Sequence, residues 1–135
     1  MIESLVLNNF HSSQKLNANY AHHFVLKTCQ RTLTLGHDIA ADNTSDETIY
    51  GKDAYFYLLE VICGLKSKLI GENEIVGQFK TAYQQYTSQS SKDNNILLIL
   101  EKLFKDAKEI RSTYLLGLSQ KTYASLARKH IVNKY

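Results

Sequence analysis

The sequence has few of the residues that build several common binding sites. Its 135 residues include no proline, six glycines and two cysteines. The glycine spacings match neither GxGxxG nor GxxxxGK, which excludes the usual fingerprints for dinucleotides and nucleoside triphosphates. The cysteines, Cys29 and Cys63, form no CxxC pair and no Cys/His cluster, so the sequence predicts reduced thiols and no metal site.

Long apolar runs are also missing. The longest aliphatic run, residues 96–100, is too short to cross a bilayer and fits a buried helical segment. The first residues, MIESLVLNN, include an acidic side chain and lack the apolar core of a signal peptide, which predicts a cytoplasmic protein with no membrane contact. The net charge of +3 permits a polyanionic partner without requiring one.

What is present predicts one α+β domain over residues 1–135, with a small, mainly antiparallel sheet from the first third packed against about four helices. Strands are predicted at residues 5–7, 24–35 and 48–50. Apolar residues at three- and four-residue steps predict helical core faces at Ala54/Leu58/Val61/Ile62/Leu65, Ile75/Phe79/Ala82/Tyr83/Tyr86, Leu100/Leu103/Phe104/Ala107/Ile110 and Tyr123/Ala127/Ile131. Expected N-caps are Asp93 or Asn94 for the third helix and Ser119 for the fourth.

The segment FVLKTCQRTLTLG, residues 24–36, brings Cys29 into polar surroundings. If the segment is one regular strand, alternation places Cys29 on the same face as Arg31 and Leu33. The thiol has three interpretations: buried packing, a metal ligand, or a nucleophile whose thiolate Arg31 stabilises. The polar neighbours favour the nucleophile, whereas Cys63, in phase with a helical core face, is expected to be buried packing.

Charged and polar residues on the predicted helices have ordinary explanations. Glu72 and Glu74 would complement the dipole at a helix start, and Gln78 on the next turn would face water. The third predicted helix is rich in cations, at Lys102, Lys105, Lys108 and Arg111. Glu101 and Asp106 stand four residues from two of these lysines, which is typical of a solvated helix face.

Three segments, which follow one another in the same order as in the family, resemble one known family of proteins. KTCQRTL, residues 27–33, is similar to the S-T-C-N-R-T-E motif of glutamyl-tRNA reductase. YLLEVICGLKSKLIGENEIVGQFKTAY, residues 57–83, is similar to that family's H-L-x-x-V-A-S-G-L-D-S-x-V-L-G-E-P-Q-I-x-G-Q-V-K-x-A-Y. Residues 100–117 resemble the family's L-x-x-L-F-x-x-A helix with its following K-x-V-R and glycine, shortened by about one helical turn.

The resemblance implies a mechanism on the C5 route to 5-aminolevulinate and tetrapyrroles. In the family, the cysteine of T-C-N-R attacks the ester of glutamyl-tRNA, and NADPH then reduces the enzyme thioester to the aldehyde. Carried over, Cys29 is the nucleophile and Arg31 holds the glutamate carboxylate in a bidentate fork. The positions that match the family's substrate contacts are Thr28, Gln30, Arg31, Ser67, Glu72, Asn73, Glu74 and Gln78.

Several positions depart from the family pattern. Tyr57 stands where the family has its active-site histidine, and is the candidate replacement. Gln30 replaces the asparagine beside the cysteine, Leu33 replaces the following glutamate, and Asn73 replaces the proline of E-P-Q. The chain also lacks an NADPH fingerprint, so the resemblance implies that another domain or protein supplies the hydride.

Three functions of different classes follow. In the first, the chain is the acyl-transfer half of an oxidoreductase that acts on glutamyl-tRNA, with an NADPH-domain protein or a tetrapyrrole-pathway protein as partner; a homodimer is compatible with it. In the second, the chain is a catalytically degenerate binding or regulatory module for tRNA or a tetrapyrrole-pathway partner. In the third, it is an unrelated thiol acyltransferase or hydrolase.

Overall fold

The structure is a computed structural model that describes residues 2–11, 23–28, 31–37, 45–65, 74–90, 92–114 and 120–134. After a 3₁₀ turn at Ile2–Ser4, its strands are β1 (Leu5–Phe10), β2 (Phe24–Lys27), β3 (Thr32–His37) and β4 (Glu47–Tyr50). Its helices are α1 (Gly51–Ile62), α2 (Glu74–Thr87), α3 (Asn94–Tyr114) and α4 (Gln120–Lys134). This confirms the α+β prediction.

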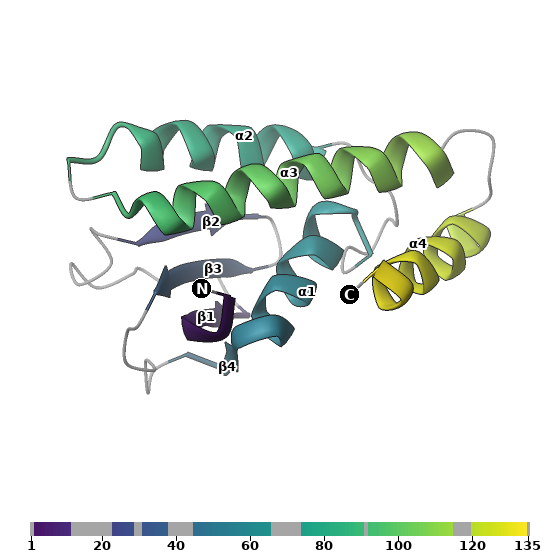
Figure 1. Ribbon diagram of the computed structural model, residues 1–135, viewed down its shortest axis with the longest axis horizontal. Coiled ribbons are helices and arrows are strands. Elements are labelled where there is room, and N and C mark those ends of the chain that lie inside the picture. The colour runs from purple at the N-terminus through teal and green to yellow at the C-terminus, as the bar shows by residue number, and fades with distance from the viewer. Residues whose placement is uncertain are drawn as a thin grey trace.

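The four strands form one antiparallel sheet in the order β2-β3-β1-β4. Helix α2 lies against the edge strand β2, and α1 lies between β1 and α3. Figure 1 shows α2 and α3 side by side over the sheet, with α4 beyond the end of α1. Among these described helices, none combines the length and apolarity that crossing a bilayer requires.

Residues 24–35 form a hairpin, so the prediction of one continuous strand is wrong. Strands β2 and β3 pair with Leu26 opposite Leu33, which places both leucines on the same face. One continuous strand would have put them on opposite faces. Both arms are apolar at alternate positions, and the reversal between them contains no Asn-Gly or Asp-Gly, so the pattern alone did not reveal the turn.

The helix-facing side of the sheet packs its alternate leucines against the predicted helical faces. Leu5, Leu7, Leu33 and Leu35 are each at most 1% exposed. The helices contribute the predicted residues Ala54, Leu58, Val61, Ile62, Leu65, Ile75, Phe79, Ala82, Tyr86, Leu100, Leu103, Ala107, Ile110, Ala127 and Ile131, all buried. Tyr83 and Phe104 are half-buried at the edge of this core, while Ser119 and the side chain of Tyr123 lie outside the described residues.

Helix α1 ends in a geometry that requires glycine. Gly64 has a φ of +79°, in the left-handed region, and its N–H donates to the Val61 carbonyl at 3.0 Å. The Leu65 N–H donates to the Glu60 carbonyl at 2.9 Å, so both bonds wrap the chain around the helix end. A side chain at position 64 would be strained in this conformation, and glycine therefore fixes the direction in which the chain leaves α1.

We expect Gly64→Ala to lower the free energy of unfolding by about 1–2 kcal/mol, because alanine is strained at a positive φ. Gly77→Ala is the matched control, since Gly77 lies exposed inside α2 and an added methyl group would meet no heavy atom within 4 Å. That control should raise the free energy of unfolding by up to about 1 kcal/mol. Urea denaturation measures both changes. If the two variants changed the free energy of unfolding in the same direction, the requirement for glycine at position 64 would be contradicted.

Candidate functional site

Three hydrogen bonds close the turn between β2 and β3. The Thr28 N–H donates to the Arg31 carbonyl at 2.9 Å. Thr28 Oγ1 donates to the same carbonyl oxygen and accepts from the Arg31 N–H, each at 3.2 Å. Cys29 and Gln30, which connect these two residues along the chain, lie outside the described residues. The structure therefore fixes both ends of the short segment that contains the candidate nucleophile.

Arg31 reaches from this turn to a polar cluster that joins α1 to the sheet. Its Nη1 donates to the Tyr57 hydroxyl oxygen at 2.8 Å. Asn9 Nδ2 donates to the same oxygen at 2.9 Å and to Glu47 Oε1 at 3.3 Å. We call these four residues the Arg31–Tyr57 cluster. Tyr57 of α1 holds the guanidinium just before the start of β3, and Asn9 of β1 and Glu47 of β4 extend the cluster behind the Tyr57 hydroxyl.

Asn9, like Glu47, is a member of the cluster that the sequence analysis missed. Its side chain is 1% exposed, and its Oδ1 has no hydrogen-bond partner among the described residues. A signal was present in the sequence: Asn9 is in phase with Leu5 and Leu7, whose side chains enter the core. A polar residue at a core-facing position of a strand has to be satisfied by neighbours or by a ligand, and this one is satisfied only in part.

Tyr57 is half-buried, and its environment keeps it protonated. Burial raises the pKa of the phenol above its ordinary value of 10.0. The positive charge of Arg31 opposes this shift in pKa, and the negative charge of Glu47 adds to it. At neutral pH the hydroxyl keeps its proton, so Tyr57 can donate a hydrogen bond but does not act as a base. A phenol in this state offers hydrogen bonding without the acid–base chemistry of a histidine.

The raised pKa of Tyr57 predicts a loss of stability in alkali. Below pH 10 the phenol is protonated in both the folded and the unfolded chain, so its contribution to stability is constant. Above that pH the unfolded chain loses the proton first, so the free energy of unfolding falls as pH rises toward the folded pKa.

Tyr57→Phe should make this decline shallower in urea denaturation between about pH 9 and about pH 11, because it removes the titrating group. Tyr50→Phe, at an exposed tyrosine, is the control. An equally steep decline in Tyr57→Phe would contradict the prediction.

A groove of about 640 Å³ runs between the edge strand β2 and helix α2. Lys27 and Val25 line it from the strand, and Glu74 and Gln78 line it from the first turns of the helix. Lys27 directly precedes Thr28, so the groove leads to the turn that contains the candidate nucleophile. Gln78 is half-buried here rather than fully solvated, whereas Glu74 is exposed.

The structure brings the sequence-predicted residues together in two neighbouring groups. Thr28, Arg31 and Tyr57 belong to the turn and to the Arg31–Tyr57 cluster, and Glu74 and Gln78 line the groove. The remaining predicted positions, Cys29, Gln30, Ser67, Glu72 and Asn73, lie outside the described residues. Within the described part of the chain, no three His, Cys, Asp or Glu side chains come together as a metal site would require.

Two other groups of potentially reactive side chains have structural explanations. Cys63 is fully buried in the hydrophobic core, which confirms the prediction of a packing role. Ser4 Oγ and His37 Nε2 are hydrogen-bonded, and His37 Nδ1 lies 4.0 Å from Asp93 Oδ2. The sequence Ser4–His37–Asp93 resembles the serine, histidine and aspartate of a nucleophilic triad. The 4.0 Å between His37 and Asp93 is, however, longer than a hydrogen bond. Asp93 instead caps α3 as predicted, since its Oδ1 accepts from the Asn95 N–H at 2.8 Å.

Comparison with known proteins gives a consistent result. Residues 2–114 match the family model described as glutamyl-tRNAGlu reductase, N-terminal domain. The chain is 34% identical over 87 residues to glutamyl-tRNA reductase of Pseudoalteromonas translucida, covering 62% of this chain and 21% of that protein. It is 29% identical over 129 residues to glutamyl-tRNA reductase of Clostridium kluyveri, covering 81% of this chain and 32% of that protein. The chain thus spans a fifth to a third of these relatives.

A solved structure shows the same fold. Glutamyl-tRNA reductase from Methanopyrus kandleri superimposes with a TM-score of 0.69 at 18% sequence identity. The match covers 86% of this chain and 36% of that one. At this identity the likeness concerns the arrangement of strands and helices, and it agrees with the antiparallel sheet and helical layer described above.

Proposed function

Because this chain belongs to the family of the glutamyl-tRNA reductase N-terminal domain, we propose that it performs the acyl-transfer half of glutamyl-tRNA reduction, in tetrapyrrole biosynthesis. The observation that supports this function is the position of Arg31. Its guanidinium is held by Tyr57 at 2.8 Å, and its backbone closes the turn that contains Cys29. The proposed nucleophile and the proposed carboxylate-binding cation are therefore two residues apart between β2 and β3.

The proposed reaction is an acyl transfer to sulfur. The Cys29 thiolate attacks the carbonyl carbon of the aminoacyl ester, and a carbon–sulfur bond forms as the carbon–oxygen bond to the tRNA breaks. The ribose oxygen of the tRNA leaves with the electron pair of that bond and takes a proton from water, and the glutamyl group remains on the enzyme as a thioester. The nearby positive charge of Arg31 favours the thiolate over the thiol, because an opposite charge lowers a thiol's pKa.

Arg31 also supplies the proposed recognition of the substrate. A guanidinium carries five N–H donors in a planar fork that matches a carboxylate, and its bond to Tyr57 engages one of them. The bond to Tyr57, whose hydroxyl is itself held by Asn9, restrains the fork and so reduces the entropy lost when the glutamate side chain binds. We assign the side-chain carboxylate of the glutamyl group to this position.

The groove between β2 and α2 is the proposed path for the rest of the substrate. Lys27 can approach a phosphate of the tRNA, and the Gln78 amide offers both donors and an acceptor. The other assigned substrate contacts rest on the family motif: Thr28, Gln30, Ser67, Glu72, Asn73 and Glu74. Glutamyl-tRNA is accordingly the proposed partner.

The residues of this chain do not fit an NADPH site. Its six glycines lack the dinucleotide spacing, and the described sheet is antiparallel, without the parallel strands that place a helix N-terminus on a pyrophosphate. We therefore derive no hydride step here, and assign that step to another domain or protein.

A second function has one observation in its favour. Tyr57 stands at the position that matches the family's histidine, and burial raises the pKa of its phenol, so it keeps its proton at neutral pH and does not act as a base. A catalytically degenerate module that binds glutamyl-tRNA or a tetrapyrrole-pathway protein would keep the Arg31–Tyr57 cluster and need no such base. It differs from the first proposal in that Cys29→Ser would leave binding unchanged and no thioester would form.

Intact mass spectrometry of the protein after incubation with glutamyl-tRNA tests the proposal. We expect a glutamyl adduct on the peptide that contains Cys29, and slow release of glutamate, because water takes the acyl group when no hydride is supplied. Cys63 is an internal control, since its buried thiol should stay unmodified. Cys29→Ser should abolish the adduct. Binding of glutamyl-tRNA with neither adduct nor hydrolysis would support the second function and overturn the first.

A further inference from the structure

A second groove lies between α2 and α3, apart from the Arg31–Tyr57 cluster. It has a volume of about 520 Å³, which is typical of small-molecule sites. Its apolar lining includes Ile62 from the end of α1, Val76 from α2, and Phe104 and Ala107 from α3. Ile62 and Ala107 are buried, while Val76 and Phe104 are half-buried and present apolar surface to the opening. We call this the α2–α3 groove.

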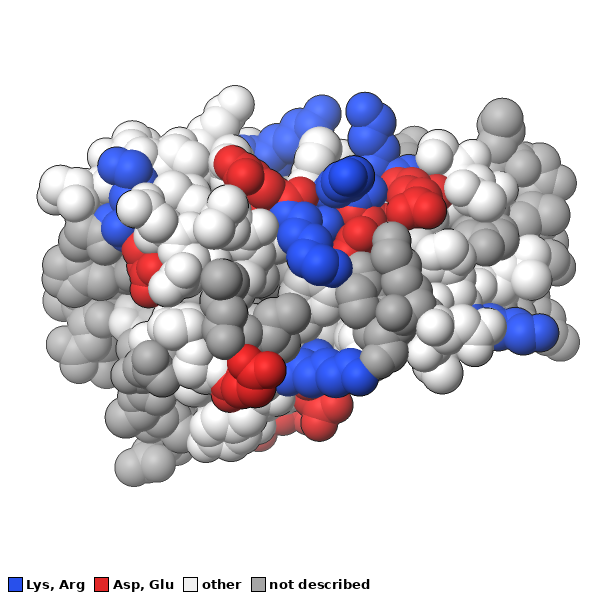
Figure 2. All heavy atoms as spheres, viewed as in Figure 1, with Lys and Arg blue, Asp and Glu red and all other residues white. Residues whose placement is uncertain are grey.

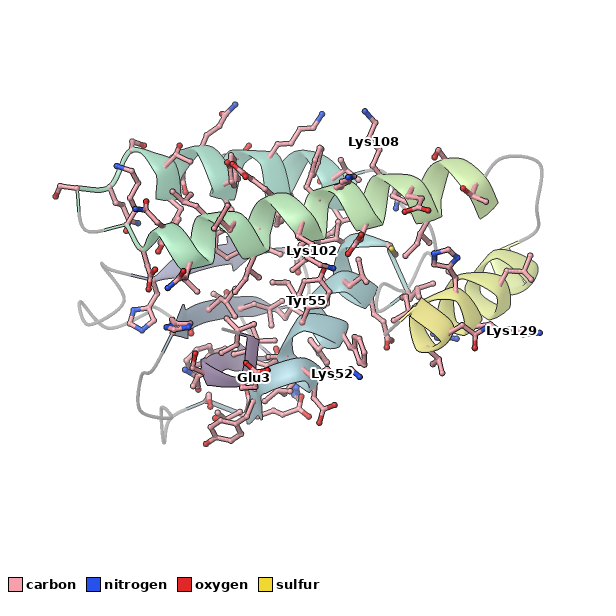
Figure 3. All side chains as sticks on the ribbon, viewed as in Figure 1. Glu3, Lys52, Tyr55, Lys102, Lys108 and Lys129 are labelled. Atoms are coloured by element: carbon pink, nitrogen blue, oxygen red, sulfur yellow. The ribbon has the colours of Figure 1, made fainter. Side chains whose placement is uncertain are left out.

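Among the described residues that line the α2–α3 groove, the charged side chains are all cations: Lys80, Lys108 and Arg111. Lys80 and Lys108 are exposed, and neither makes an ion pair within 4.0 Å with any described carboxylate. Figure 3 shows Lys108 projecting outward from α3, and Arg111 is fixed at the other end by a bond from Nη1 to the Ile62 carbonyl at 3.4 Å. Positive charge thus rims an apolar floor.

The cations of the groove differ from those on the rest of this face. Figure 2 shows Lys and Arg over α2 and α3 interleaved with Asp and Glu, so the face as a whole is not of one sign. Among the described residues that line the α2–α3 groove, none carries a carboxylate. The local charge complements an anion of small size better than an extended polyanion, because a long polyanion would also meet the acidic side chains.

The floor of the groove favours a flat apolar body. The Phe104 ring stacks on the Phe79 ring with centroids 5.8 Å apart and planes 7° apart. Lys80 Nζ lies 5.6 Å from the Phe104 centroid, and Phe104 also lines a smaller adjoining cavity of about 360 Å³. The ring is therefore reachable from the groove while its position is set by Phe79. Aromatic rings prefer parallel-offset or edge contacts with other rings.

We propose that the α2–α3 groove binds a small organic anion: an apolar, ring-containing body on Phe104 and Val76, with one carboxylate, sulfonate or phosphate between Lys80 and Lys108. Gly77 lines this groove as well as the groove between β2 and α2, and an added methyl group would meet no heavy atom within 4 Å. An exposed glycine inside a helix is destabilising by about 1 kcal/mol, and close approach of a ligand is one reason to keep it. This site is independent of the proposed acyl transfer.

The probe for this site is 8-anilinonaphthalene-1-sulfonate, a ring-containing anion, with uncharged N-phenyl-1-naphthylamine as its matched neutral analogue. We expect the anion to bind with one-to-one stoichiometry by calorimetry. Its chemical-shift changes in ¹H–¹⁵N spectra should centre on residues 76–80 and 104–112. The neutral analogue should bind at least about tenfold more weakly, because it lacks the group that the lysines attract.

Lys80→Glu/Lys108→Glu should weaken binding of the anion by at least about tenfold. Lys92→Glu/Lys105→Glu is the control, because it makes the same change in net charge with two exposed lysines that do not line the groove. Ser112→Trp fills the rim of the groove without changing charge and should also weaken binding of the anion. This variant tests the proposal if the charge reversal unfolds the protein. Equal loss in the control pair, equal affinity for the neutral analogue, or shifts centred on another surface would each overturn the proposal.

Discussion

Arg31→Ala should slow formation of the Cys29 thioester by roughly a hundredfold or more. Removing a charge that pairs with a substrate carboxylate costs about 2–5 kcal/mol, and a hundredfold corresponds to about 2.7 kcal/mol. The loss should be specific to the substrate's acid group. Wild-type protein should prefer glutamyl-tRNA to glutaminyl-tRNA, whose side chain is the neutral isostere, and Arg31→Ala should lose most of that preference. Single-turnover rates with both substrates measure the effect.

Two further variants separate recognition from a general loss of structure. Arg31→Lys keeps the charge but not the planar fork, so its rate should lie between those of wild type and Arg31→Ala. Lys52→Ala, at an exposed position on the helix that contains Tyr57, should change neither the rate nor the preference. If Arg31→Ala retained the wild-type preference for the glutamyl ester, the assignment of the carboxylate to Arg31 would be wrong.

Asp106→Ala should lower the free energy of unfolding by roughly 2–3 kcal/mol, or about 6–12 °C in Tm. Asp106 is 5% exposed, accepts a hydrogen bond from the Tyr55 hydroxyl at 2.5 Å and pairs with Lys102 Nζ at 3.1 Å. Tyr55 is itself 1% exposed, so truncating Asp106 would leave a buried hydroxyl without this acceptor. Figure 3 shows Tyr55 of α1 and Lys102 of α3 close together across the helix interface.

A double-mutant cycle tests whether this effect belongs to the pair. Tyr55→Phe/Asp106→Leu removes both polar groups together, so its cost should be less than the sum of the two single changes. Glu109→Ala, which removes an exposed carboxylate from the same helix, should stay within about 0.5 kcal/mol of wild type. Additive losses in the cycle, or a loss below about 1 kcal/mol for Asp106→Ala, would show that the bond to Tyr55 stabilises little.

Asp106 also shows where reasoning from spacing was wrong. Its distance of four residues from Lys102 predicted a solvated pair, and the pair does form. The carboxylate nevertheless lies in the interface between α1 and α3, because the helix face that carries it is turned toward Tyr55. Spacing along one helix sets which side chains are neighbours, but the packing of a second helix decides which of them leave the solvent.

The hairpin of β2 and β3 is a similar case. Alternation correctly identified residues 24–35 as extended, but a chain that continues and a chain that folds back can share the same pattern. The register that pairs Leu26 with Leu33 is set by packing of both leucines against the helices. That reversal, rather than a shared strand face, is what puts Thr28 and Arg31 in contact around the candidate thiol.

By itself, the sequence determined the fold class, the helical core faces and the candidate nucleophile with its flanking arginine, because apolar periodicity and local motifs are properties of neighbouring residues. Only the tertiary structure decided what Arg31 contacts. The guanidinium donates to the Tyr57 hydroxyl, which Asn9 also contacts, and Asn9 in turn contacts Glu47. Asn9, Glu47 and Tyr57 come from three distant segments, and no local pattern indicates that they join Arg31 in one cluster. The same holds for the cations of the α2–α3 groove, which come from two helices and become one site only because those helices pack side by side.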